Sequence, residues 1–254
     1  PRPRGARSAF KTEPASQFPL QFGTIQGFDG TPIFYCEEGA GPPLVFCYGF
    51  ACSPLHWTYQ IDYFRKNFRC IWLDYRGHGR TPIPEKLENL TVDAIVKDIN
   101  SVLNFLEIPK AVVLGHSMGV NVALEYAHQF PEKVQALVLA NGTPKRPLET
   151  LFGGNLLGPA FQLFLNIEKT IPELVEEIWN VKGKAEVFSV LFGALGFNRK
   201  MSHTDDIRAY ADQIAAFSPL VMALLMANYE SFDATPWLHT IKHPTLILSG
   251  DKDY

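Results

Sequence analysis

The sequence predicts an α/β fold, with a mostly parallel central sheet, helices on both of its faces and a helical cap. Three observations support this. Strand-like apolar runs alternate with helical runs between residues 42 and 142, helical sequence continues from 147 to 238, and an apolar run returns at 244–251. We therefore expect a flexible tail (1–19), a core built from 20–146 and 239–254, and a cap inserted at 147–238.

The first half of the core begins with a hairpin. Two β-rich runs, 21–28 and 31–39, flank Asp29-Gly30, a strong turn signal. The continuous apolar runs at 42–50 and 68–75 predict buried strands. Between them, Ser53 is typical of a helix cap and predicts a helix through residue 67.

The second half continues the alternation. A helix is expected from Thr91 because apolar residues recur three and four positions apart. A strand over 111–116, a helix over 118–129 and a strand over 134–142 follow. Because strands joined through helices run parallel, these strands are expected to place their carboxyl ends at one edge of the sheet.

Composition excludes several functions. The 254 residues are 46% hydrophobic and 19% charged, which is typical of a globular protein, and a net charge of −3 gives no reason to expect a nucleic-acid partner. No apolar run reaches the roughly 18 residues that a membrane-spanning helix needs. The cysteines show no metal-binding spacing, so we expect reduced, structural thiols and no metal: Cys36, Cys47, Cys52 and Cys70.

The tail is basic and rich in proline and small residues, with Arg2, Arg4, Arg7 and Lys11. It shows no apolar core of the kind found in signal peptides. The compartment stays open on this basis, with a cytoplasmic location slightly favoured.

Gly115-His116-Ser117-Met118-Gly119 matches G-x-S-x-G between an expected strand and an expected helix. In such a turn the serine takes a strained conformation, and glycines two positions away on either side avoid collisions. The turn exposes the Ser117 hydroxyl and directs the Met118 amide toward a developing oxyanion. The alternative is a plain Gly-Ser turn that only joins strand to helix.

Four segments in order, "CYGF", "DYRGHGRT", "GHSMG" and "PTLILSGDKD", make the chain resemble the α/β-hydrolase family, in its serine-nucleophile branch with a helical cap. The resemblance covers residues 21–253 and implies a Ser-Asp-His triad without a cofactor. It assigns Ser117 as nucleophile and Asp253 as acid, with Asp251 as the less favoured acid. The oxyanion donors would be the amides of Phe50 and Met118.

The resemblance also contains departures and alternatives. Tyr48 stands where the family usually has histidine, and the loop around Phe50 could be a purely structural turn. Asp74 and His78 look catalytic, but their loop is mainly structural in the family. His116 is interpreted as a packing or lining residue. The remaining histidines are interpreted as solvated or packed residues: His56, His128, His203, His239 and His243.

The triad histidine is absent from these 254 residues, because the family places it after the acid. Three explanations stay open: a segment that follows residue 254, a separate chain that completes the fold, or a protein that has lost catalysis. We favour the first two, since an unpaired apolar strand at 244–251 would be an aggregation hazard. The isolated chain is expected to be inactive.

The resulting expectation is a serine hydrolase acting on an ester, lactone or thioester-type bond of a lipophilic small molecule. Cap phenylalanines could line an apolar pocket or form the cap's own core. The expected lining residues are Tyr48, His116, Phe152, Phe188 and Phe217. The alternatives are C–C bond hydrolysis, acyl transfer or perhydrolysis by the same triad, and a non-catalytic ligand-binding protein.

Overall fold

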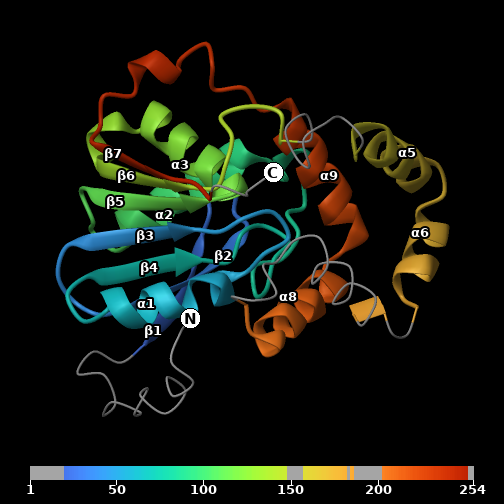
Figure 1. Ribbon diagram of the computed structural model, residues 1–254, viewed down its shortest axis with the longest axis horizontal. Helices are drawn as coiled ribbons and strands as arrows, with labels where there is room; N and C mark the ends of the chain where they lie inside the picture. The colour runs from blue at the N-terminus through green and yellow to red at the C-terminus, as the bar shows by residue number, and fades with distance from the viewer. Residues whose placement is uncertain (1–19, 148–156, 182–183, 186–201, 251–254) are drawn as a thin grey trace.

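A computed structural model describes residues 20–147, 157–181, 184–185 and 202–250 (Figure 1). Its strands form one sheet in the order β1-β2-β4-β3-β5-β6-β7. The strands are β1 (Gln21–Gln26), β2 (Pro32–Glu38), β3 (Pro43–Cys47), β4 (Arg69–Leu73), β5 (Ala111–His116), β6 (Val134–Ala140) and β7 (Thr245–Leu248).

The sheet is mostly parallel, as the alternation of strands and helices predicts. β1 and β2 form the antiparallel hairpin expected around Asp29-Gly30, and β2 also pairs antiparallel with β4. From β4 through β3, β5 and β6 to β7, all neighbours run parallel. The fold class is therefore confirmed.

The strand order reverses between β3 and β5. The chain leaves β3 for β4 on one side and then returns to form β5 on the other side. Cys47, the last residue of β3, pairs with Gly115 of β5. In sheets of this type the loops that leave such a point diverge and open a crevice at the carboxyl ends of the strands, where ligands bind. This position locates the site described below.

The core helices begin where the sequence predicts. Ser53 caps a 3₁₀ turn (Pro54–Trp57) that leads into α1 (Thr58–Phe64). The Thr91 side chain accepts a hydrogen bond from the Ala94 amide (3.0 Å) at the start of α2 (Val92–Phe105). α3 (Met118–Gln129) follows β5 directly, and its buried face packs against α2 and the sheet.

Four described helices lie between β6 and β7 in the chain: α5 (Leu157–Thr170), α6 (Pro172–Trp179), α8 (Thr204–Ala216) and α9 (Pro219–Ser231). Figure 1 shows these inserted helices gathered on one side of the sheet, past the arrowhead of β4. α9 is tied to the core, because the Asn228 side chain accepts a hydrogen bond from the Val92 amide (2.9 Å). No single described helix is long and apolar enough to span a membrane, and α8 and α9 meet that test only as a pair bent by 98°.

Candidate active site

Ser117 occupies a strained turn between β5 and α3. Its backbone has φ 55° and ψ −124°, a conformation that non-glycine residues rarely adopt. A Cβ atom at Gly115 would lie 2.3 Å from the Gly119 carbonyl oxygen, and one at Gly119 would lie 2.1 Å from the Cys47 carbonyl oxygen. The glycines therefore allow the turn to close on itself and α3 to approach the end of β3.

This close approach brings the loop after β3 beside Ser117. A Cβ atom at Gly49 would lie 3.0 Å from the Ser117 Cβ and 3.4 Å from its Oγ. The loop is a tight turn in which the Cys52 amide donates to the Gly49 carbonyl (3.2 Å) and Ala51 has φ 51°. Phe50 lies inside this turn, and Met118 is the first residue of α3, where amides lack partners within the helix. The loop that contains Phe50 therefore lies beside the Ser117 turn, and Met118 follows Ser117 in the chain.

Tyr48 is fully buried beneath this loop. Its hydroxyl oxygen accepts a hydrogen bond from the Tyr75 amide (2.6 Å), and the two rings stack with centroids 3.9 Å apart. The side chain was expected to line the substrate site, but these contacts give it a packing role. The hydrogen bond and ring stacking of Tyr48 therefore connect the loop after β3 to the loop after β4.

His78 is buried in the same cluster, 3% exposed. Its Nδ1 lies 2.9 Å from the Arg76 carbonyl oxygen and so donates a hydrogen bond to it, while burial lowers the pKa of the imidazole to about 4. The ring is therefore neutral at pH 7. Phe217, which follows α8, lies 4.4 Å from the His78 ring and 6.5 Å from the Phe50 ring. Phe217, one of the expected lining residues, thus lies beside the loop that contains Phe50.

The charged residues of the loop after β4 make ion pairs and hydrogen bonds within the fold. Arg76 is 1% exposed, and its guanidinium binds Asp98 (2.6 and 2.7 Å) and Asp29 (2.6 and 3.0 Å) through two bonds each. Asp74 accepts a hydrogen bond from the Arg80 amide (2.9 Å). These contacts connect the β1–β2 hairpin and α2 to this loop, and they favour the structural interpretation of Asp74.

Tyr229 of α9 was not anticipated from the sequence. It is 5% exposed and belongs to the buried core, and Ser117 is among the groups that influence the pKa of its phenol. Burial raises the pKa of the phenol above its ordinary value, so it stays protonated near neutral pH. The sequence signal was one tyrosine in the polar last turn of a helix that is apolar from Pro219 to Ala227. Nothing in the local pattern could identify its distant partner.

The other expected site residues are placed only in part. His116 packs edge-on against Trp57, with ring centroids 6.2 Å apart. Phe152, Phe188, Asp251 and Asp253 lie outside the described residues. The chain that leads to Asp253 is described as far as Gly250, whose amide donates to the Asn141 side-chain oxygen (3.2 Å) at the end of β6. Asn141 has a left-handed conformation with φ 48°. The sequence pattern did not predict its contact with Gly250.

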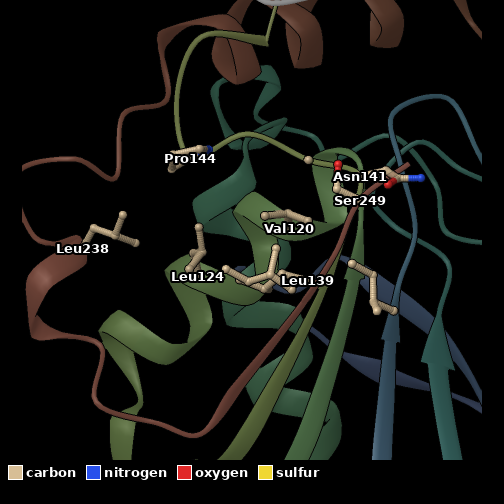
Figure 2. Close-up of a pocket in the computed structure, with 10 residues that line it drawn as sticks. Val120, Leu124, Leu139, Asn141, Pro144, Leu238 and Ser249 are labelled. Carbon is tan, nitrogen blue, oxygen red and sulfur yellow. The ribbon is translucent and has the colours of Figure 1, made fainter. Parts of the chain in front are cut away.

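The cysteines form no disulfide, and a groove lies away from Ser117. All four cysteines are buried and free. No group of three or more His, Cys, Asp or Glu side chains among the described residues could hold a metal ion. A groove of about 280 Å³ lies beside α3 and β7, lined mainly by apolar side chains such as Val120, Leu124 and Leu139 (Figure 2). Ser117 is not one of the groove's lining residues.

The family described as alpha/beta hydrolase fold matches residues 42–254. Among curated relatives, epoxide hydrolase 4 of Mus musculus is 27% identical over 223 residues, which cover 85% of this chain and 61% of the relative. Epoxide hydrolase 4 of Homo sapiens is 29% identical over 223 residues, with coverages of 85% and 60%. The chain thus spans about three fifths of the length of these relatives.

Solved structures show the same fold. An enol-lactonase from Burkholderia xenovorans superposes with a TM-score of 0.71 at 18% identity, covering 90% of this chain and 81% of the other. An esterase from Exiguobacterium antarcticum superposes with a TM-score of 0.66 at 22% identity, covering 88% and 79%. At these identities the likeness supports the architecture alone.

Proposed function

Because the chain belongs to the alpha/beta hydrolase fold family, we propose that it is a serine hydrolase that cleaves the ester, lactone or thioester-type bond of a lipophilic small molecule. The observation that carries the proposal is the strained Ser117 turn at the switch point of the sheet, with the Phe50 loop beside it. Strain of this kind persists where the surrounding structure enforces it, and it is concentrated at active sites. The inserted helices would form the cap over the site.

In the proposed reaction the Ser117 oxygen attacks the acyl carbon while its proton passes to a histidine that follows residue 254. Asp253 would orient that histidine, and the amides of Phe50 and Met118 would stabilise the oxyanion. The histidine then protonates the leaving group as the bond to the acyl carbon breaks. Water, activated by the same histidine, releases the acid and restores Ser117.

A serine at position 117 argues against epoxide hydrolysis by this chain, although its relatives include epoxide hydrolases. Attack by a serine hydroxyl on an epoxide carbon would form an ether, which water does not readily cleave, so the enzyme would not turn over. Attack on an acyl carbon forms an ester, which a histidine-activated water hydrolyses. The residue at the turn therefore favours acyl substrates for this chain.

The aromatic residues around the loop that contains Phe50 support a lipophilic substrate. The rings of Phe50 and Phe217 face each other edge-on, and the Phe217 ring also lies against the buried, neutral His78. An aromatic surface of this kind would bury an acyl chain without leaving a charge unpaired.

The test uses the complete gene product, a fluorophosphonate probe and p-nitrophenyl esters of graded chain length. Wild-type protein should label and turn over, with medium or long chains preferred, whereas Ser117→Ala should lose labelling and at least about a thousandfold in kcat. Ser101→Ala on α2, remote from this turn, is the matched control. Equal labelling or turnover by wild type and Ser117→Ala would contradict the proposal. Turnover confined to an epoxide or a vinylogous diketone would indicate a different chemistry.

A further inference from the structure

We propose that a cavity between α1 and α8 binds a small organic cation, a protonated amine or a quaternary ammonium group, between the Asp206 carboxylate and the rings of His56, Tyr59 and Tyr210. The cavity has a volume of about 430 Å³. Ser117 is not one of its lining residues. The inference therefore concerns a second site and does not depend on the serine-hydrolase function proposed above.

The cavity lies where the inserted helices meet the core. One wall comes from α1 and the 3₁₀ turn before it, and the other comes from α8 and Ser202. Two contacts join the walls. The Tyr59 hydroxyl donates to the Asp206 carboxylate oxygens (3.3 and 3.2 Å), and the rings of His56 and Tyr210 meet edge-on with centroids 5.0 Å apart. Because these contacts hold both walls in place, a ligand would meet a site that is already formed, which lowers the cost of binding.

The lining offers aromatic surface to a cation. A cation is attracted to the face of an aromatic ring, because the face carries negative charge density. The planes of the His56 and Tyr210 rings are inclined by 72°, so they form a corner and not a flat stack. Tyr59 is 58% exposed, so a ligand can reach the cavity from solvent. A rounded cation that enters there would contact rings of different orientation.

The charge of the cavity selects the sign of the ligand. Asp206 is its one lining carboxylate among the described residues, and neither lysine nor arginine of this part of the chain lines it. Burial lowers the pKa of the His56 imidazole, so this ring is neutral at pH 7. The distances from the Tyr59 hydroxyl to Asp206 exceed the usual range of about 2.5–3.0 Å between two oxygens, so this hydrogen bond is weak and the carboxylate can accept a cation.

Choline provides the test, together with the neutral alcohol in which carbon replaces the choline nitrogen. The two molecules share a shape and differ in charge. Isothermal titration calorimetry on the complete gene product at pH 7 should show saturable choline binding, at least about tenfold tighter than binding of the alcohol. Absence of saturable choline binding, or equal affinity for the two molecules, would overturn the inference.

Asp206→Asn should weaken choline binding about tenfold and leave binding of the alcohol unchanged. Asp205→Asn is the matched control, because Asp205 lies in the same first turn of α8 but does not line the cavity. It removes the same charge and should bind choline like wild type. Equal weakening by the two variants would overturn the inference, because the charge of this helical turn would then explain the binding without the cavity.

Tyr59→Leu should weaken choline binding several-fold, because it removes one of the rings. Tyr63→Leu removes a 70% exposed ring from the same helix outside the cavity and should leave the binding unchanged. Equal effects of these two variants would contradict the assignment of the site. Fluorophosphonate labelling of Ser117 is measured separately, so a failure of this inference leaves the serine-hydrolase proposal intact.

Discussion

His78 makes the stability of the fold depend on pH. The imidazole lies among the rings of Tyr48, Tyr75 and Phe217, and its Nδ1–H donates a hydrogen bond to the Arg76 carbonyl. Protonation of the second nitrogen would place a charge inside this aromatic cluster. Burial therefore lowers the pKa to about 4, below the ordinary value of 6.5. An unfolded chain binds this proton more strongly, so stability falls as pH falls from 6.5 to 4.

His78→Gln removes the titration while keeping a hydrogen-bond donor for the Arg76 carbonyl. Relative to this variant, wild type should lose about 2 kcal/mol of unfolding free energy between pH 7 and pH 5. Urea unfolding at the two pH values measures the difference. His203→Gln, at an exposed imidazole, controls for the removal of a histidine from the unfolded chain. Parallel pH curves for wild type and His78→Gln would show that His78 does not carry this dependence.

At the scale of the element, local patterns predicted what local forces decide. The hairpin, the cap at Thr91 and the glycines around Ser117 follow from turn geometry, capping and short-range sterics, and the structure shows all three. Contacts between distant elements left no such signal. Tyr48 was expected to line the site, yet its hydroxyl accepts a hydrogen bond from the Tyr75 amide. Tyr229 is buried on α9, which packs against α2, and the local pattern did not predict this contact between distant elements.

That docking depends on Asn228, which caps α2 from another element. Asn228→Ala should lower the unfolding free energy by about 1 kcal/mol, a usual cost of losing a cap. Because the residue also anchors α9 next to Tyr229, fluorophosphonate labelling of Ser117 should change in rate as well. Thr91→Ala removes the cap within α2 at similar cost but leaves α9 attached, so its labelling rate should match wild type. Equal labelling by both variants would show that the anchor does not reach the site.

At the scale of the whole molecule, the two edge strands of the sheet expose different amounts of apolar surface. β1 exposes Phe22 among polar residues, whereas β7 exposes Leu246, Ile247 and Leu248 in succession, with Ile247 73% exposed. β7 pairs with β6 on one side, and its other edge meets no strand among the described residues. The groove beside α3 continues this apolar surface. An edge of this kind is a template for pairing with another chain.

A protein made of residues 1–254 should therefore self-associate through β7, and Ile247→Lys should weaken that association by an order of magnitude or more. A lysine on an edge strand opposes pairing because two like charges would be brought together. Sedimentation velocity over a range of concentrations measures the association, and circular dichroism checks that the fold is kept. Ile83→Lys places the same charge at a 41% exposed apolar residue outside the sheet, and it should leave association unchanged. If both variants associate like wild type, the contact between copies does not involve the exposed edge of β7.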